Sequence, residues 1–322
     1  MTARVGGVEG LAGGGALDEA LAVLVQAALA EDLGPAGVAG GDLSSLWTVP
    51  EGHESRGEVV AKEPLVLSGV GAFMAVISAV DPRVSVTSHR ADGDALEPGE
   101  VALELTGPTR SILAAERTAL NFLGRLSGVA TLTARYVAAV QGTGTRIVDT
   151  RKTTPGWRLL EKAAVRHGGG TNHRLGLWDM VLVKDNHIDA CGGVAQAARA
   201  AVQGRGERTG QAQGDERSGP PAEERVEIEV EVRDLEELEA LLGVDVDRIL
   251  LDNMSRVDVE AAVARVSHLD PDDRPLLEAS GNVTLETVAE VAATGVDLVS
   301  VGALTHSAPV ADLSLLLRAS QA

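Results

Sequence analysis

The first third of the chain alternates between helical and β-type hydrophobic patterns. Apolar residues recur at helical spacing from Leu17 to Leu33, which predicts an amphipathic helix. A second helical pattern covers residues 111–140, and the small residues at Ser127-Gly128 predict a break inside it. Between them lie short β-type runs separated by Gly, Pro and Asp turns, which predict antiparallel β structure. These runs are residues 57–61, 65–68, 84–87 and 101–106.

After residue 145 the pattern changes to short, nearly continuous apolar runs that alternate with helix-like segments. Strands of a parallel sheet are buried on both faces, so they lose the alternation of apolar and polar residues. Crossover helices between such strands are typical of α/β folds. The second part of the chain therefore predicts a parallel sheet covered by helices. The expected strands are residues 147–149, 180–183, 227–232, 248–251, 276–279 and 298–301.

Two segments depart from these patterns. Residues 1–16 are rich in glycine and predict a disordered tail, and residues 203–225 are polar and rich in Gly and Pro, which predicts an exposed, mobile insertion. The 322 residues are enough for two domains, and no apolar run approaches the length of a membrane span. The single Cys191 excludes an internal disulfide and favours a cytoplasmic protein.

The charge distribution narrows the function. A net charge of −19 argues against general binding of nucleic acid or anionic membranes. Against this background, residues 146–184 contain eight Lys and Arg residues and only three acids, a local excess of +5. A cationic segment of this density in an acidic chain indicates a site for a small polyanion.

Polar or glycine residues follow the expected strands directly. In (β/α) barrels the active site is built from the C-terminal ends of the strands, so these residues are candidates for one site. The last two segments resemble the late-strand phosphate sites of barrels, where backbone N–H groups hold the anion. The segments are Thr150-Arg151-Lys152, Lys184-Asp185-Asn186-His187, Asp252-Asn253, Ser280-Gly281-Asn282 and Gly302-Ala303.

A row of acids occupies one face of the expected strand at 227–232. Glu227, Glu229 and Glu231 alternate with apolar residues, and buried carboxylates need cations or hydrogen-bond donors nearby. Glu227 and Glu229 are expected to be structural partners of Lys or Arg. Glu231 and Asp252, from neighbouring strand ends, are suited to sugar hydroxyls or to Mg²⁺ carrying a pyrophosphate.

The ordered motifs resemble the quinolinate phosphoribosyltransferase family, also called carboxylating nicotinate-nucleotide pyrophosphorylases. They are ERTALNFLGRLSGVAT, DTRKTTPGWRLLEKAAVRHGGGTNHRLGLWDMVLVKDNHI, EIEVEV, ILLDN, EASGN and VSVGALTHSAPVADLSL. The resemblance begins near residue 17, and the insertion at 203–225 is a departure from it. It implies an α/β fold with an N-terminal α/β sandwich at 17–128, joined by the C-terminal segment 307–322. An incomplete, seven-stranded α/β barrel would occupy residues 129–306.

The resemblance also implies a reaction. The family transfers a phosphoribosyl group from 5-phosphoribosyl 1-diphosphate (PRPP) to quinolinate with Mg²⁺. The products are nicotinate mononucleotide, pyrophosphate and CO₂, on the de novo route to NAD. Its members are at least homodimers, in which one subunit completes the active site of the other.

Site roles follow from the matching motif positions. Arg151, His173, Arg174 and Lys184 would hold the two quinolinate carboxylates, since guanidinium groups match carboxylates in a bidentate manner. Thr150 would donate a hydrogen bond, and Arg117 would come from the neighbouring subunit. Lys184 or a water would protonate the carbon that loses CO₂. For PRPP and Mg²⁺ the resemblance implies Lys152, Glu231, Asp252, Ser280, Gly281, Asn282, Gly302 and Ala303, with the metal held directly or indirectly by Glu231 and Asp252.

Simpler interpretations stand beside these roles. Arg117 is equally compatible with a surface position on a helix, Arg151-Lys152 with a solvated loop, and His173-Arg174 with a structural turn. His167 and His187 are expected only to cap or pack, and Lys162 with Arg166 to form surface pairs or to line the cationic segment. At the level of the whole protein the alternatives are a related pyrophosphorylase of the kind associated with molybdenum transport, and an anion-binding barrel without turnover. Competition between quinolinate and nicotinate separates the first of these from a quinolinate enzyme.

Overall fold

The computed structural model describes residues 14–212, 225–271 and 273–319, and this part of the chain divides into two compact units. Unit 1 contains residues 14–135, 152–172 and 302–319. Unit 2 contains residues 136–151 together with the described part of 173–301. The units interleave along the sequence, whereas the sequence had suggested one boundary at residue 128 and a C-terminal return from residue 307.

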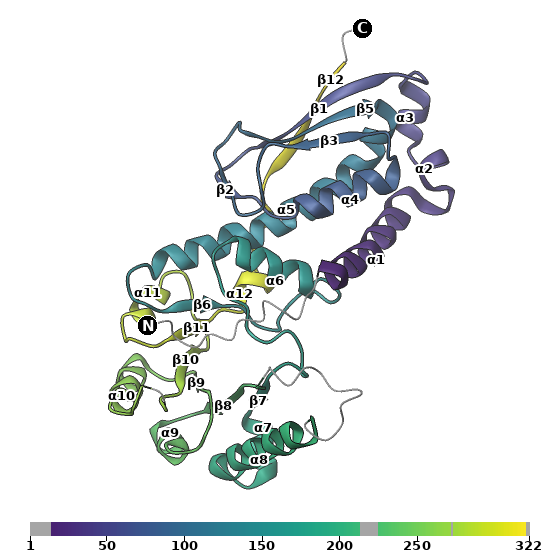
Figure 1. Cartoon of the computed structure of the whole chain (residues 1–322). Coiled ribbons are helices and arrows are strands. Elements are labelled where there is room, and N and C mark those ends of the chain that lie inside the picture. The colour runs from purple at the N-terminus through teal and green to yellow at the C-terminus, as the bar shows by residue number, and fades with distance from the viewer. Residues whose placement is uncertain (1–13, 213–224, 272, 320–322) are drawn as a thin grey trace. The chain divides into compact units, whose positions relative to one another are not determined.

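Unit 1 is built on a four-stranded antiparallel sheet with the order β12-β1-β5-β3. The central strand β1 pairs with β5 on one side and with β12, from the end of the chain, on the other. Figure 1 shows α4 and α5 along one face of this sheet. The strands are β1 (Glu54–Ala61), β3 (Ser85–Ser88), β5 (Val101–Pro108) and β12 (Leu313–Ala319), and the short strands β2 (Leu65–Val66) and β4 (Ala95–Leu96) form a separate pair.

The helices of unit 1 begin earlier than the sequence predicted. Helix α1 starts at Gly14, so residues 14–16 of the expected disordered tail are helical, and residues 1–13 lie outside the described residues. The helical elements are α1 (Gly14–Leu33), the 3₁₀ turn η1 (Gly34–Ala36), α2 (Gly37–Gly40), α3 (Leu43–Thr48), α4 (Val70–Val80), α5 (Thr109–Ala139), α6 (Arg158–His167) and α12 (Ala303–His306).

The break predicted at Ser127-Gly128 is wrong, because α5 runs through both residues without interruption. These positions are small for another reason. The Ser127 hydroxyl accepts a hydrogen bond from the Ser68 N–H at 3.0 Å and donates to the Ser68 carbonyl at 3.1 Å. A Cβ at Gly128 would stand 1.8 Å from the carbonyl oxygen of Pro309. Close approach of neighbouring segments therefore selects the small residues that resemble a break signal.

Unit 2 is a parallel sheet with the order β6-β11-β10-β9-β8-β7, accompanied by α7 to α11. Its described strands number six, one fewer than the resemblance implied. Between β6 and β7 the described chain contains α6 and a glycine-rich irregular stretch in place of a further strand. The elements are β6 (Arg146–Val148), β7 (Val181–Val183), α7 (Asp185–Cys191), α8 (Val194–Ala212), β8 (Ile228–Val232), α9 (Leu235–Leu241), β9 (Arg248–Asp252), α10 (Arg256–Val266), β10 (Leu276–Ser280), α11 (Val288–Ala292) and β11 (Leu298–Ser300).

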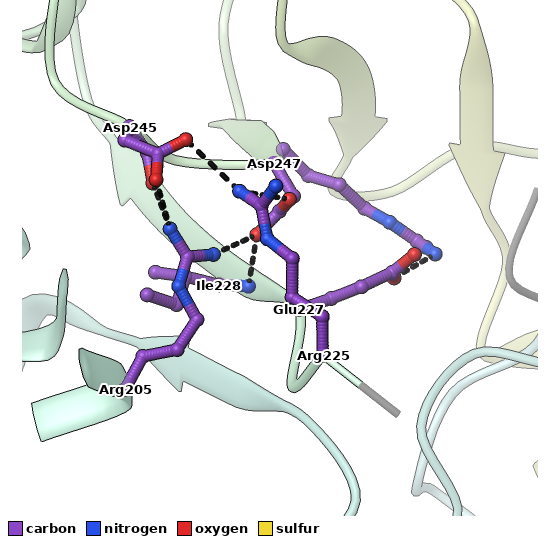
Figure 2. Close-up of polar contacts among 7 residues, drawn as sticks. Arg205, Arg225, Glu227, Ile228, Asp245 and Asp247 are labelled. Carbon is purple, nitrogen blue, oxygen red and sulfur yellow. Dashed lines mark hydrogen bonds and ion pairs between the residues drawn. The ribbon is translucent and has the colours of Figure 1, made fainter. Parts of the chain in front are cut away.

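The segment expected to be a mobile insertion begins as helix. Helix α8 continues to Ala212, so residues 203–212 are helical, and residues 213–224 lie outside the described residues. Figure 2 shows Arg205 of α8 and Arg225 converging on the same two acids, Asp245 and Asp247. Asp247 also accepts a hydrogen bond from the backbone N–H of Ile228 at 2.8 Å. This cluster fixes the start of β8 at the N-terminal end of the sheet.

In the described part of the chain, no helix combines the length and the apolar character needed to cross a membrane.

Candidate active site

The inner face of the unit 2 sheet carries charged residues in layers. Parallel pairing places Glu229 level with Arg248, and Glu231 two residues further along β8. Near the N-terminal end of the strands, the Arg248 guanidinium forms an ion pair with Glu227, which confirms the structural role predicted for Glu227. Glu227, directly before β8, is therefore paired at the N-terminal edge of the sheet, while Glu229 and Glu231 lie further along the strand.

A buried cluster of His173, Glu229 and Glu278 forms the middle layer. Imidazole Nε2 of His173 lies 2.8 Å from Glu229 Oε2 and 3.4 Å from Glu278 Oε2, and the three side chains are at most 6% exposed. The backbone N–H of His173 donates to Asp149 Oδ1 at 2.8 Å, which fixes the segment that carries the ring. Glu229 thus pairs with a histidine, where a Lys or Arg partner was predicted.

Proton positions in this cluster follow from one hydrogen bond. Burial lowers the pKa of His173, but the charges of Glu278 and Glu229 outweigh burial and raise it to about 10, which favours a doubly protonated ring. However, the backbone N–H of Arg174 donates to His173 Nδ1 at 2.8 Å, so Nδ1 acts as an acceptor. A proton on Nδ1 would place two hydrogens between these two nitrogens, and Nδ1 is therefore unprotonated. We therefore assign a neutral ring that donates from Nε2 to Glu229. The proton that a doubly protonated ring would have carried is assigned to the Glu229 carboxyl, whose pKa is raised by burial and by the charge of Glu278.

Two arginines next to this cluster lack matching anions. Arg151 follows β6, and its buried Nε has no hydrogen-bond partner in the described structure. Arg174 is 8% exposed and makes one long side-chain bond, from Nη1 to the carbonyl of Met180 at 3.3 Å. Burial and the charge of Arg151 lower the pKa of Arg174. Two guanidinium groups that repel each other and retain unused donors are suited to an anion with carboxylate or phosphate geometry.

Lys184 and Glu231 form the upper layer at the ends of β7 and β8. The Lys184 ammonium lies 2.7 Å from Glu231 Oε2, and the backbone N–H of Asp185 reaches Glu231 Oε1 at 3.4 Å. Nδ1 of His187 accepts a hydrogen bond from the Lys184 N–H at 3.0 Å, which confirms the prediction that His187 caps a helix. The Lys184 side chain is 46% exposed, which leaves part of it accessible to a ligand.

The ends of β9 and β10 form a compact turn region. Asn253 and Asn282 both adopt positive φ angles, 51° and 48°, and Gly281 has a φ of 110°. A Cβ at Gly281 would meet Asn253 Oδ1 at 2.2 Å, so only glycine fits between these turns. Asn253 also donates to the Asp252 carboxylate at 2.9 Å. Asn253 also donates its backbone N–H to the carbonyl of Ser280 at 2.9 Å, so the two turns are joined; left-handed turns are a backbone type that can hold anions, and the predicted phosphate contact of Ser280, Gly281 and Asn282 stays a prediction.

Four of the predicted site residues belong to unit 1. Arg117 is exposed on α5, and among the described residues it has no hydrogen bond or ion pair. Lys152 lies in the loop after β6, and its Cδ would be 3.0 Å from a Cβ at Gly302. Gly302 and Ala303 form the N-terminus of the short helix α12. Absence of a side chain at Gly302 therefore leaves room for the lysine to lie across it.

Sequence reasoning did not single out two residues of the unit 2 site. Glu278 lies in the EASGN motif but was not predicted to belong to the site. The two-residue period of the strand could have placed it on the face of β10 that meets His173. Asn253 was named only as a neighbour of Asp252, and its left-handed backbone has no signal in the sequence beyond the tolerance of asparagine for that conformation. Lys162, expected near the surface, is 2% exposed.

The parallel sheet, with its cationic pair and its acid–lysine pair at the carboxyl ends of the strands, defines an α/β enzyme domain that accepts small polyanions. Matches to two family models identify the family. Residues 42–127 match the N-terminal domain of quinolinate phosphoribosyl transferase, and residues 129–210 and 215–316 match its C-terminal domain. The chain belongs to the quinolinate phosphoribosyltransferase family.

Individual relatives agree with this assignment. The chain is 42% identical to a carboxylating nicotinate-nucleotide pyrophosphorylase of Mycobacterium leprae, over 85% of this chain and 90% of the relative. It is 39% identical to a probable enzyme of the same name from Bacillus subtilis, over 88% and 89% of the two chains. Among solved structures, nicotinate-nucleotide pyrophosphorylase from Francisella tularensis superposes with a TM-score of 0.80 at 35% identity, covering 94% of this chain and 97% of that one. The NadC structure from Streptococcus pyogenes gives a TM-score of 0.80 at 37% identity, with coverages of 93% and 96%.

Proposed function

We propose that this chain catalyses phosphoribosyl transfer from PRPP to quinolinate with loss of CO₂, giving nicotinate mononucleotide and pyrophosphate for NAD biosynthesis. The observation that carries the proposal is the pair Arg151 and Arg174, two largely buried guanidinium groups with unused donors and a mutual repulsion. A dianionic substrate relieves that repulsion. Quinolinate brings two carboxylates on adjacent carbons of a pyridine ring, which match two guanidinium groups and the nearby Lys184.

The buried cluster beneath the arginines suits this substrate. His173 holds the backbone of Arg174 through Nδ1, and Glu229 and Glu278 hold His173 from below. With a neutral ring, the cluster adds no further positive charge to the arginine pair. His173 therefore contributes to quinolinate binding by orienting Arg174 and by shaping the floor of the site.

The transfer step needs no covalent enzyme intermediate. The pyridine nitrogen attacks C1 of the ribose while the bond from C1 to the pyrophosphate oxygen breaks, and positive charge develops on the sugar. The Glu231 and Asp252 carboxylates are the proposed groups that stabilise this charge and hold the ribose hydroxyls, and Lys152 balances the departing pyrophosphate. Ser280, Gly281, Asn282, Gly302 and Ala303 are the proposed holders of the 5-phosphate.

Decarboxylation follows from the new positive charge on the ring nitrogen. The bond between the ring carbon and its carboxylate breaks, CO₂ leaves, and the electron pair stays on the carbon beside the quaternary nitrogen. A proton from Lys184 or from a water then completes the C–H bond. Lys184 can approach such a position because its side chain is partly exposed and its ammonium binds only the Glu231 carboxylate among the described residues.

Mg²⁺ is the proposed cofactor, and the donor set suits it. Glu231 and Asp252 supply carboxylate oxygens from neighbouring parallel strands, the ligand type that Mg²⁺ prefers in phosphate sites. A bound ion would neutralise pyrophosphate charge during the transfer. Glu231 shares its carboxylate with the Lys184 ammonium, whereas Asp252 accepts from the neutral amide of Asn253, so a cation would compete with a charged partner at Glu231 alone.

The proposed assembly is a homodimer in which Arg117 of one subunit reaches the quinolinate site of the other. Its exposure on α5 supports this role, because a guanidinium without a partner among the described residues is available for contact. The proposed compartment is the cytoplasm, and apart from the second subunit the proposed partners are the small-molecule substrates.

The direct test is product formation. Purified protein with Mg²⁺, PRPP and quinolinate is expected to release nicotinate mononucleotide, pyrophosphate and CO₂ in equal amounts. Nicotinate should be used poorly and should compete weakly, because it lacks the second carboxylate. Absence of all three products would refute the proposal, and equal use of nicotinate would favour the related pyrophosphorylase.

A further inference from the structure

Arg125 lies on α5 of unit 1 and binds three acceptors from two other segments. Its Nη1 donates to the carbonyl of Ala308 at 2.9 Å, and its Nη2 donates to Glu161 Oε1 at 2.8 Å and to the carbonyl of Thr305. The Arg125 side chain is 21% exposed and Glu161 is fully buried. A pair with a fully buried carboxylate fixes geometry strongly, because Glu161 without Arg125 would be a buried charge lacking its cation.

Glu161 extends the contact to the loop that contains Lys152. Its Oε1 accepts from the Thr154 hydroxyl at 2.8 Å, and its Oε2 accepts from the Thr154 backbone N–H at 3.0 Å. Thr154 is two residues beyond Lys152. The Glu161 carboxylate thus joins Arg125 to the backbone immediately after the lysine.

Thr305 closes the arrangement from the other side. Its hydroxyl donates to the carbonyl of Lys152 at 2.8 Å and lies 3.2 Å from the carbonyl of Gly302. Its own carbonyl accepts from Arg125. The loop at 152–154 and the segment at 302–308 are therefore tied to each other directly, and both are tied to the same guanidinium.

We propose that Arg125 and Glu161 are positioning residues for the PRPP phosphates, which set the place of Lys152 relative to Gly302 and Ala303 without touching substrate. The inference rests on the proposed function, in which those residues hold the phosphates. The planar guanidinium supplies donors in fixed directions to three acceptors, which the single ammonium of lysine cannot reproduce. The close passage of Lys152 over Gly302 makes the arrangement sensitive to small shifts.

The effect expected is selective for PRPP. Displacing a substrate-holding group by about 1 Å can lower a rate by about 100-fold. Loss of the contacts that Arg125 and Glu161 make, which we call the brace, should therefore weaken phosphate binding and slow the transfer. For Arg125→Met and Arg125→Lys we expect the KM for PRPP to rise by about 10-fold or more and kcat to fall. The KM for quinolinate should change by less than about threefold, because the partners of Arg125 and Glu161 are Ala308, Thr305 and Thr154, and none of these is a proposed quinolinate contact.

Two further variants and a matched control make the test decisive. Thr305→Val removes only the hydroxyl that binds the Lys152 carbonyl, and Glu161→Gln removes the charge while keeping the shape. Arg135→Met is the control, since Arg135 is exposed on the same helix and has no hydrogen bond or ion pair among the described residues. PRPP binding is measured by calorimetry as well as by kinetics, and circular dichroism with thermal unfolding verifies each fold.

The outcomes separate the two proposals. If the wild-type protein binds PRPP but forms no product, the proposed function fails and the calorimetric comparison of variants still tests the brace. If Arg125→Met folds poorly, the comparison rests on Thr305→Val, whose weaker PRPP binding supports the brace and whose unchanged binding overturns it. Equal changes of the two KM values in folded variants would also overturn it, since they indicate a general structural role.

Discussion

Replacement of Arg151 by methionine should make the free protein more stable and less able to bind quinolinate. The buried Nε of Arg151 has no partner, and an unsatisfied buried donor costs about 1–3 kcal/mol. The charge of Arg151 also disfavours the charged form of Arg174, so its removal relieves a repulsion. Methionine retains the unbranched stem without the donors. We expect Arg151→Met to raise the free energy of unfolding by about 1–2 kcal/mol, which corresponds to a rise in Tm of a few degrees.

Binding of quinolinate should reverse the order of stability of Arg151→Met and the wild type. Each hydrogen bond between a charged group and its partner contributes about 1.5–3 kcal/mol, so loss of the Arg151 contacts should weaken quinolinate binding by about 10- to 100-fold. At a quinolinate concentration of about 100 times the wild-type Kd, ligand adds about 2.7 kcal/mol to the stability of the wild type. The variant gains far less at the same concentration. Urea unfolding with and without quinolinate should therefore show the variant as more stable alone and the wild type as more stable with ligand.

Arg199→Met is the matched control, because Arg199 is exposed on α8 and has no hydrogen bond or ion pair among the described residues. It should change neither the stability nor the binding by a measurable amount. A lower stability of free Arg151→Met would refute the prediction, since Arg151 would then be satisfied in the folded state. The prediction also fails if quinolinate stabilises the variant and the wild type equally.

Three further predictions concern stability. Gly128→Ala should destabilise the protein by about 1–3 kcal/mol in urea unfolding, because its Cβ would overlap the carbonyl oxygen of Pro309. The better helix propensity of alanine would not offset this overlap, and an unchanged urea midpoint would contradict the prediction. Hydrogen bonds from Arg83 and Ser111 hold the pKa of Asp81 well below its usual range, so its contribution is present above pH 4 or so and is lost as the pH falls further. The acid unfolding curve of Asp81→Asn should accordingly lie closer to that of the wild type at low pH than at pH 7. Burial raises the pKa of Glu229, so the stability that its protonated form contributes is present below the unfolded pKa near 4.3 and is lost as the pH rises. The stability of Glu229→Gln relative to wild type should therefore increase from pH 5 to pH 8. A pH-independent difference would contradict the assignment of the proton to Glu229.

Hydrophobic period and length located the six strands of the parallel sheet and three of the four strands of the antiparallel sheet to within a few residues, but they did not predict β12. Strand 227–232 is an example, since the structure places β8 at Ile228–Val232. The same signals could not separate close packing from a helix break at Gly128, because both favour small residues. Nor could they show that Glu229 meets a histidine, which lies 56 positions earlier in the chain. Partners of buried charges depend on tertiary structure, so the candidate residues were accessible from sequence while their pairings were not.

The paired aspartates at the start of β9 have a consequence for how this chain tolerates change in length. Arg205 and Arg225 both end on Asp245 and Asp247, so the two ends of the intervening segment are held in one place at the N-terminal edge of the sheet (Figure 2). When the ends of a segment are fixed, doubling its length adds only about 0.6 kcal/mol of closure entropy. The chemistry proposed here occupies the opposite edge, where the strands end. Sequence inserted between the two arginines, such as a tag or a reporter domain, would therefore be added at the edge of the parallel sheet that the proposed reaction does not use.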